Sequence, residues 1–378
     1  MRGAVRKIDA KKWDRAAGTR QNTEGVGGQG LWLRAGFKSD AEEERGRMGM
    51  RDRILALMMQ NQIGYLSGEQ IAAECGISRA AVWKHIDQLK KLGCVIDAKP
   101  NCGYRLVSLP DSLDPTIVKT FDFSGLLKSG VTLKHFETVD STNEAAKRFA
   151  AKGDKDKTVY IAEEQTAGRG RLDRSWSSKK GANLMFTILL RPTFRPQDAS
   201  KVPIIAAVAV AQSLRSFTRL DARVKWPNDV LIGSKKICGI RCELAADFDR
   251  TELLIVGIGV NVNQTVFPKE LSEKAASVRT ETNRNTSRPQ LLLSILSDFF
   301  DLYQKTFEED GFDDVIVEYT KMSVLFQQMI TIQAGGRETH GRCIGFDREG
   351  CLIMQNEQNR RVRIMAGEVS IRSEKTYV

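Results

Sequence analysis

The segment EEQTAGRGRLDRSW, residues 163–176, combines a flexible backbone with side chains that bind anions. The NH groups of Gly168 and Gly170 can approach an anion closely, because glycine has no side chain. Three arginines of the same loop can each clasp a phosphate or carboxylate, and these are Arg169, Arg171 and Arg174. The segment therefore predicts a cationic loop that orders around an anionic ligand. A solvated surface loop and a second nucleic-acid patch are the alternatives.

Other short strings could add to this chemistry. KWPNDV, residues 225–230, places a lysine, an asparagine and an aspartate in a tight turn. KKICGI, residues 235–240, follows with Lys236, and GIGVN, residues 257–261, ends an apolar strand with glycines and an amide. Taken singly, these strings also fit a proline turn, a surface lysine and a glycine bulge.

The histidines and cysteines restrict the chemistry. The chain has three histidines, and none lies between His135 and His340. A serine–histidine triad or a histidine-rich metal site is therefore excluded from that stretch. The seven cysteines are scattered without a CxxC pair, which indicates reduced thiols and no metal site. The chemistry of the central region must use lysine, arginine, asparagine, aspartate, hydroxyl or backbone groups.

Length and charge set the broad class of protein. The 378 residues are enough for two or three domains, and 41% are hydrophobic, which allows a sizeable core. The net charge of +11 favours an anionic partner. The longest apolar run, residues 202–211, is too short for a membrane span, and no signal-peptide block begins the chain. We expect a cytoplasmic protein without a membrane partner.

The N-terminal third predicts a DNA-binding module. Residues 1–48 are polar and glycine-rich, and we expect a disordered extension. Helical patterns at 53–62, 67–76 and 79–93 and a hairpin at 94–107 predict a winged helix-turn-helix over 50–110. A helical module for protein contacts is the alternative. The candidate DNA-binding residues are Ser78, Arg79, Ala80, Trp83, Lys84 and Lys99, although for Trp83 itself we favour a place in the core.

The pattern of strands and helices in the remaining chain predicts an α+β fold. Beyond a proline-containing linker at 108–116, strands and helices mix over residues 117–325, the expected catalytic domain. Three successive strands are expected across 222–263, after a long buried helix at 198–217. Short strands with glycine turns over 326–378 predict a small, SH3-like β-barrel.

Five strings, in this order, resemble the motifs of the biotin–protein ligases: STNEAA, EEQTAGRGR, KWPNDV, KKICGI and GIGVN. With the preceding winged helix, the chain is similar to the bacterial enzymes that are both biotin–protein ligase and biotin operon repressor. This resemblance covers about 52–378 and implies a class II synthetase-like catalytic domain. It implies that biotin reacts with ATP and Mg²⁺ to biotinyl-5′-AMP, and that a lysine of a biotin carboxyl carrier protein then takes the biotin.

The resemblance also implies a role for individual residues. The implied biotin-binding residues are Ser141, Thr142, Asn143, Gln165, Gly168, Arg169, Arg171, Lys236, Gly239, Gly257 and Gly259. The implied ATP or adenylate contacts are Arg171, Arg174, Trp176, Asn228 and Asn261. The implied catalytic residues are Lys236, Arg171 and Asp229. Leu172 and Asp173 depart from the familiar pattern, which often continues with arginine and glycine, and this departure bears on the role of Arg174.

A DNA-binding module joined to a ligase suggests regulation by the intermediate. We hypothesise that biotinyl-5′-AMP is the corepressor and that a homodimer, paired at a sheet edge, binds palindromic operator DNA. Three rival functions remain: a lipoate-type ligase of the same fold, a transcription factor whose ligase fold is only a sensor, and a single-function ligase whose winged helix does not bind DNA.

Overall fold

The computed structural model describes residues 49–61, 64–171, 174–247, 250–334, 337–365 and 370–373. The extension expected at 1–48 lies outside these residues. Within the described ranges, no helix has the combination of length and apolar character needed to cross a bilayer.

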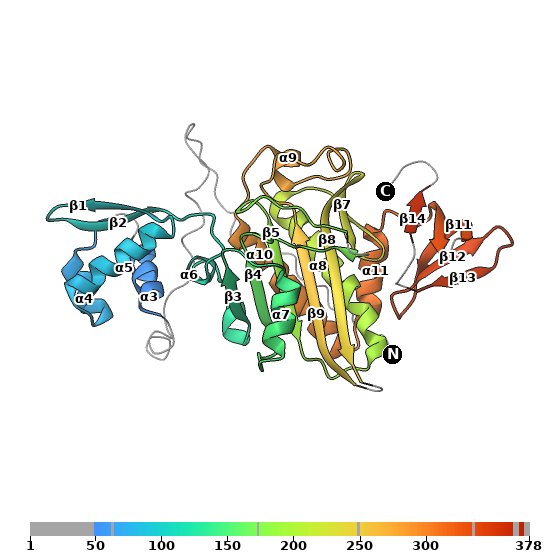
Figure 1. Ribbon diagram of the computed structural model, residues 1–378, viewed down its shortest axis with the longest axis horizontal. Coiled ribbons are helices and arrows are strands. Elements are labelled where there is room, and N and C mark those ends of the chain that lie inside the picture. Colours follow the sequence, from blue (N-terminus) through green and yellow to red (C-terminus); the bar gives the residue numbers. More distant parts are fainter. Residues whose placement is uncertain are drawn as a thin grey trace, which may run out of the picture. The chain divides into compact units, whose positions relative to one another are not determined.

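The winged helix-turn-helix forms as the sequence predicts (Figure 1). It comprises α3 (Met50–Gln60), α4 (Gly68–Cys75), α5 (Arg79–Lys91) and the hairpin of β1 (Val95–Lys99) and β2 (Gly103–Ser108). Ser67 and Gln70 make a reciprocal capping box at the start of α4, and Gly76 ends this helix with a φ of 67°. The Ser78 side chain accepts from the Ala81 NH and so starts α5.

The position of Trp83 differs from the prediction. Helix α5 buries Val82, Ile86 and Leu89, whose spacing of four and three residues defines one helix face. Trp83 lies about 100° round the helix from Val82, and it is 65% exposed. The preference for a core tryptophan was wrong, because the aliphatic residues alone fill the interface with α3 and α4.

The central domain is built on a seven-stranded sheet with the order β3-β4-β5-β9-β8-β7-β6. Only the β3–β4 pair is parallel among these neighbours. The strands are β3 (Thr132–Phe136), β4 (Thr158–Ala162), β5 (Leu184–Leu190), β6 (Ala222–Lys225), β7 (Asp229–Ile232), β8 (Lys235–Ala246) and β9 (Thr251–Val260). The predicted mixed α/β domain is thereby confirmed.

The region 222–263 contains four strands rather than the three expected. The string KWPNDV interrupts what the sequence suggests is one strand, and Lys225 of β6 pairs with Asp229 of β7 across the turn. The Trp226–Pro227 peptide within the turn is cis. Trp226 is buried and donates from Nε1 to the Gly350 carbonyl at 2.9 Å. Proline has no NH for a sheet ladder, so the strand ends here and the chain reverses.

Helices cover the two faces of the sheet differently. The large core lies on one face, under α8 (Lys201–Thr218), α10 (Arg288–Phe307) and α11 (Phe312–Met322). On the other face α7 (Thr142–Ala150) packs its alanines against Tyr160, Leu189 and Ile255. Since side chains alternate along a strand, Gly257 and Gly259 face the same side as Ile255. This second face carries both α7 and a bare stretch of sheet.

Short helices and a small sheet complete the chain. The short helices are α6 (Pro115–Lys119), η1 (Leu126–Ser129), η3 (Pro196–Ser200) and α9 (Val278–Thr282). The C-terminal strands are β10 (Met329–Ala334), β11 (Arg337–Phe346), β12 (Leu352–Asn356), β13 (Arg361–Ile364) and β14 (Ser370–Ser373), paired antiparallel in the order β13-β12-β11-β10-β14. The described pairs leave β13 and β14 at the edges, so closure into a barrel stays a prediction.

A buried arginine fastens the linker to the central domain. Arg288, at the start of α10, is 2% exposed. Its Nε lies 3.0 Å from Asp111 of the linker, and its Nη1 lies 2.6 Å from Glu163 at the end of β4. Leu113 of the linker also donates its NH to Glu163 at 2.9 Å and is fully buried in the central core. The linker is therefore part of the packed structure next to the segment 163–176.

Candidate functional site

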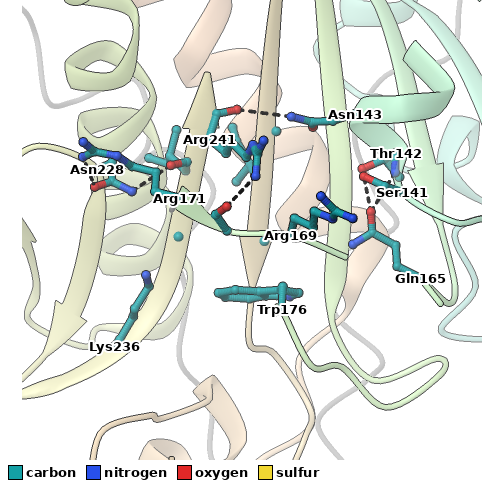
Figure 2. A pocket seen from close by; sticks show the side chains of 16 residues that line it. Ser141, Thr142, Asn143, Gln165, Arg169, Arg171, Trp176, Asn228, Lys236 and Arg241 are labelled. Atoms are coloured by element: carbon teal, nitrogen blue, oxygen red, sulfur yellow. Dashed lines mark hydrogen bonds between the residues drawn. The ribbon is translucent and has the colours of Figure 1, made fainter. Parts of the chain in front are cut away.

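Two glycines form a bare floor at the centre of the sheet. Gly239 of β8 lies directly opposite Gly259 of β9 in the strand register. A Cβ on Gly259 would lie 2.6 Å from Cε2 of Trp176, and one on Gly239 would lie 3.1 Å from Cζ3 of the same ring. Only glycine leaves room for the indole, which lies across the floor (Figure 2). The indole Nε1 is buried and has no hydrogen-bond partner among the described residues, so it can donate to a ligand.

The first turn of α7 lines a polar pocket beside this floor. The Thr142 NH and hydroxyl donate to Gln165 Oε1 at 2.7 and 3.0 Å. The Thr187 hydroxyl lies 2.8 Å from the Thr142 hydroxyl and 2.7 Å from Asn143 Oδ1. Asn143 occupies the space that a side chain at Gly257 would need. The pocket thus presents buried amide and hydroxyl groups in fixed orientations, which suits a neutral, hydrogen-bonding head group.

The cationic loop folds as a narrow hairpin over the floor. The Trp176 NH donates to the Gly168 carbonyl at 2.9 Å, and the Gly170 NH donates to the Arg174 carbonyl at 2.7 Å. The tip residues Leu172 and Asp173 lie outside the described residues. The structure describes only the two arms of this hairpin. That the loop orders around an anion therefore stays a prediction.

Two cations lie at the wall formed by β7 and β8, Lys236 on β8 itself and Arg171 from the loop. Lys236 Nζ is 2.7 Å from Asp229 Oδ1 and 6.0 Å from the centre of the Trp176 ring. Arg171 donates to Asn228 Oδ1 at 2.9 Å, and Asn228 in turn donates to the Ile240 carbonyl at 2.8 Å. Burial lowers the pKa of Arg171, against the effect of Asp229, but a guanidinium stays charged in proteins. This wall can stabilise negative charge that develops over the floor.

The segment 163–176 begins with Glu163, whose carboxylate stays charged. Burial by itself raises the pKa of Glu163, but the nearby His135 ring, the Arg288 charge and the Leu113 NH lower it to about 2. His135 Nε2 is 3.7 Å from this carboxylate, which is beyond hydrogen-bond distance. Two residues further on, Gln165 contacts Thr142. The ion pair thus fixes the backbone that carries the pocket.

The cleft brings together most of the predicted site residues. Those that line it are Ser141, Thr142, Asn143, Gln165, Arg169, Arg171, Trp176, Asn228, Lys236, Gly239, Gly257 and Gly259. Gly170 also belongs to the lining. Trp176, expected to contact the adenylate, lies on the glycines that were expected to line the biotin pocket.

Four predicted residues lie outside this lining. Gly168 supports Trp176 through its carbonyl, and Asp229 reaches the cleft through its ion pair with Lys236. Arg174 is exposed on the outer arm of the hairpin. Asn261 is buried and donates to the Ala276 carbonyl at 3.0 Å, which braces a neighbouring loop.

Arg241 was not among the residues predicted from the sequence. This residue lines the cleft from β8, and its Nη1 donates to the Gly170 carbonyl at 2.5 Å. Its partner is a backbone atom 71 positions away, so the residue types carry no sign of the contact. The one available signal is an arginine within the largely apolar strand KKICGIRCELAA.

The candidate DNA-binding residues form an exposed array. Ser78, which caps α5, and Arg79, Ala80, Trp83 and Lys84 of its first half are all exposed. Lys99 is exposed at the end of β1 in the wing. One face of α5 packs in the module while the opposite face presents cationic and aromatic side chains. Such a helix can enter the major groove of DNA.

Metal-ligating side chains do not cluster in the described part of the chain. No group of three or more histidine, cysteine, aspartate or glutamate residues is placed there to hold a metal ion. A divalent cation that arrives on a nucleotide needs only one or two protein carboxylates, because phosphate and water supply its other ligands.

Comparison with known proteins identifies both modules. Residues 135–263 match the model of the biotin/lipoate A/B protein ligase family, and residues 51–105 match a helix-turn-helix domain. The chain is 32% identical over 317 residues to the bifunctional ligase/repressor BirA of Bacillus spizizenii, covering 82% of this chain and 96% of that protein. The BirA of Escherichia coli is 28% identical, with 85% and 97% covered.

A solved structure resembles about two thirds of the chain. The biotin protein ligase of Aquifex aeolicus, in complex with biotin and ATP, matches with a TM-score of 0.58 and 28% identity. The match covers 64% of this chain and 99% of that one.

Proposed function

The chain belongs to the family of bifunctional biotin–protein ligases and repressors, and from this premise we propose that its central cleft joins biotin to ATP and then to protein. The observation that carries the proposal is the cleft itself. A pocket of oriented amides and hydroxyls meets two cations over a floor from which side chains are absent. A neutral head group with a carboxylate tail needs this combination.

In the first half-reaction, a carboxylate oxygen of biotin attacks the α-phosphorus of ATP. A new P–O bond forms and pyrophosphate leaves, which yields biotinyl-5′-AMP. The charge that grows on the phosphoryl oxygens is stabilised by Lys236 and Arg171, which both line the cleft. The ion pair with Asp229 orients the Lys236 ammonium, and Asn228 orients Arg171.

The head-group pocket sets which acid reacts. Ser141, Thr142, Asn143 and Gln165 offer the donors and acceptors that the ureido ring of biotin requires. Lipoate has no such ring, so it would leave unused the donors and acceptors that these groups offer beyond their mutual hydrogen bonds, and this costs affinity. Biotin is therefore preferred over the lipoate-type alternative.

In the second half-reaction, a lysine amine of the biotin carboxyl carrier protein attacks the mixed anhydride and AMP leaves. Asp229 is proposed to position this amine or to accept its proton. Mg²⁺ is proposed to arrive with ATP as part of the substrate. Adenylate contacts by Trp176, Arg174 and Asn261 are further predictions, and of these three only Trp176 lines the cleft.

The winged helix is proposed to repress biotin biosynthesis genes. Arg79, Trp83 and Lys84 on α5 and Lys99 on the wing would contact operator DNA, with biotinyl-5′-AMP as corepressor. A homodimer would supply the second half-site, and the protein would act in the cytoplasm. A ligase whose winged helix does not bind DNA is the second candidate.

The test is biotin-dependent exchange of radiolabelled pyrophosphate into ATP, followed by transfer of biotin to a carrier domain. We expect exchange with biotin and none with lipoate. Exchange with lipoate alone would reassign the substrate, and exchange with neither would overturn the ligase. Footprinting of a biotin-gene promoter with and without biotin and ATP tests repression; equal protection under both conditions would exclude coupling.

A further inference from the structure

Arg241 places a second charge cluster against the cationic loop. It occupies the middle of β8 and pairs in register with Gly257 of β9. Its side chain is 25% exposed and points into the cleft that Lys236 and Arg171 also line. A wall that holds the body of biotin needs apolar contact, so an arginine here requires its own explanation.

The guanidinium contacts both the loop and a carboxylate on its own strand, and Figure 2 shows the first of these contacts. Nη1 donates to the Gly170 carbonyl at 2.5 Å, and Nε lies 3.2 Å from Glu243 Oε1 on the same strand. Glu243 is itself held by Asn143 at 2.8 Å and by Lys147 at 3.0 Å. Burial raises the pKa of Glu243, but these partners outweigh burial and lower it overall. The carboxylate thus stays charged and keeps Arg241 aimed at the loop.

The position of Gly170 determines how the rest of the loop is held. The NH of the same residue holds the opposite arm through Arg174, and the next residue, Arg171, is bonded to Asn228. A donor that fixes Gly170 therefore fixes both arms of the hairpin and the cation beside it. Since β8 also carries Lys236, one rigid strand sets the positions of the ammonium group and of the loop.

We propose that Arg241 is a positioning residue that latches the two described arms of the cationic loop, 168–171 and 174–176, over the cleft, with Glu243 as the group that orients it. This inference rests on the proposed function, because the latch matters only when the loop encloses biotinyl-5′-AMP. A closed loop slows the escape of the intermediate and excludes water from the mixed anhydride. The role of Arg241 is therefore retention of the intermediate and not the chemical step.

The test follows the release of added biotinyl-5′-AMP from the full-length protein, so that it does not depend on adenylate synthesis. We expect Arg241→Leu to release the intermediate about ten to a hundred times faster, as for loss of one charge-assisted hydrogen bond. Arg241→Lys keeps a cationic donor but not the planar fork of the guanidinium, and it should fall between wild type and leucine. Glu243→Gln should show a smaller acceleration. Arg360→Leu removes an exposed guanidinium from the turn between β12 and β13 and is the matched control.

Limited trypsin digestion supplies a second readout, since the loop contains Arg169, Arg171 and Arg174 as cleavage sites. With biotinyl-5′-AMP bound, the leucine variant should be cut in the loop faster than the control. Release and cleavage equal to the control would overturn the latch. A purely structural arginine would lower the unfolding temperature without changing release, and would overturn it too. Failure of the wild-type protein to bind biotinyl-5′-AMP would instead refute the proposed function. If Arg241→Leu does not fold, Arg241→Lys and Glu243→Gln still allow the test.

Discussion

The central cleft and helix α5 both present cationic side chains, but they hold them in different ways. In the cleft Lys236 is paired with Asp229, Arg171 with Asn228, and Arg241 with Gly170 and Glu243. On α5, Arg79 and Lys84 stand exposed in solvent, and only the opposite helix face is packed.

The difference corresponds to the ligand that each region meets. A small ligand with one reactive atom needs charges fixed before it binds, because reorganising them would raise the barrier. A long polyanion presents many phosphates, so flexible cations on a rigid helix can adjust to it. The cleft therefore depends on the contacts of each cation, whereas α5 depends on its buried face.

Loss of a fixed cation should have the largest effect. Lys236→Ala should lower the rate of pyrophosphate exchange about 100- to 1000-fold, as when one preorganised charge contact is removed from a developing anion. Biotin binding by calorimetry should persist, because the head-group pocket is untouched. The neighbouring Lys235→Ala is the control and should keep near wild-type exchange. A rate for Lys236→Ala close to that of the control would remove the lysine from the mechanism.

The buried ion pair should appear in the pH dependence of stability. The pKa of Glu163 is depressed to about 2 from an ordinary 4.5, so its contribution is complete above pH 4.5 and is lost as the pH falls toward 2. This shift corresponds to about 3 kcal/mol. The free energy of unfolding of Glu163→Gln should lie below wild type by about this amount near pH 6, and the gap should narrow in acid. Urea unfolding from pH 6 to 3 checks this, and a constant gap would contradict it.

Loss of one exposed side chain on α5 should have the smallest effect, and only on DNA. Trp83→Ala should weaken operator binding by about 1–3 kcal/mol if the ring contacts base edges or methyl groups. Pyrophosphate exchange should stay at the wild-type rate, since Trp83 lies in the winged helix, whose core cluster is separate from that of the central domain. Lys91→Ala, near the far end of α5, is the control. Equal DNA affinity of both variants would show that Trp83 is not at the interface.

The sequence predicts the elements well where spacing or capping determines them. The capping box at Ser67 and the apolar spacing of Val82, Ile86 and Leu89 are local signals, and the winged helix follows from them. The same spacing places Trp83 outside the buried face of α5, contrary to the preference for a core position.

The cleft could not be found from local signals alone. Its residues come from separate strands and loops, and the motif strings identified them only through resemblance to a family. The contact of Arg241 with a backbone carbonyl leaves no pattern of residue types. Likewise, the reversal at Trp226–Asn228 depends on how KWPNDV turns between β6 and β7, which strand propensity does not encode.

The ion pair between Arg288 and Asp111 bears on how a catalytic fragment should be cut from this chain. A fragment beginning at residue 117, where the domain was expected to start, would lack Asp111 and the buried Leu113. Its Arg288 guanidinium would lose an anionic partner, and a hydrophobic site in the core would stand empty. A fragment that begins at residue 108 would retain both, so those nine residues belong with the enzyme when the two modules are separated.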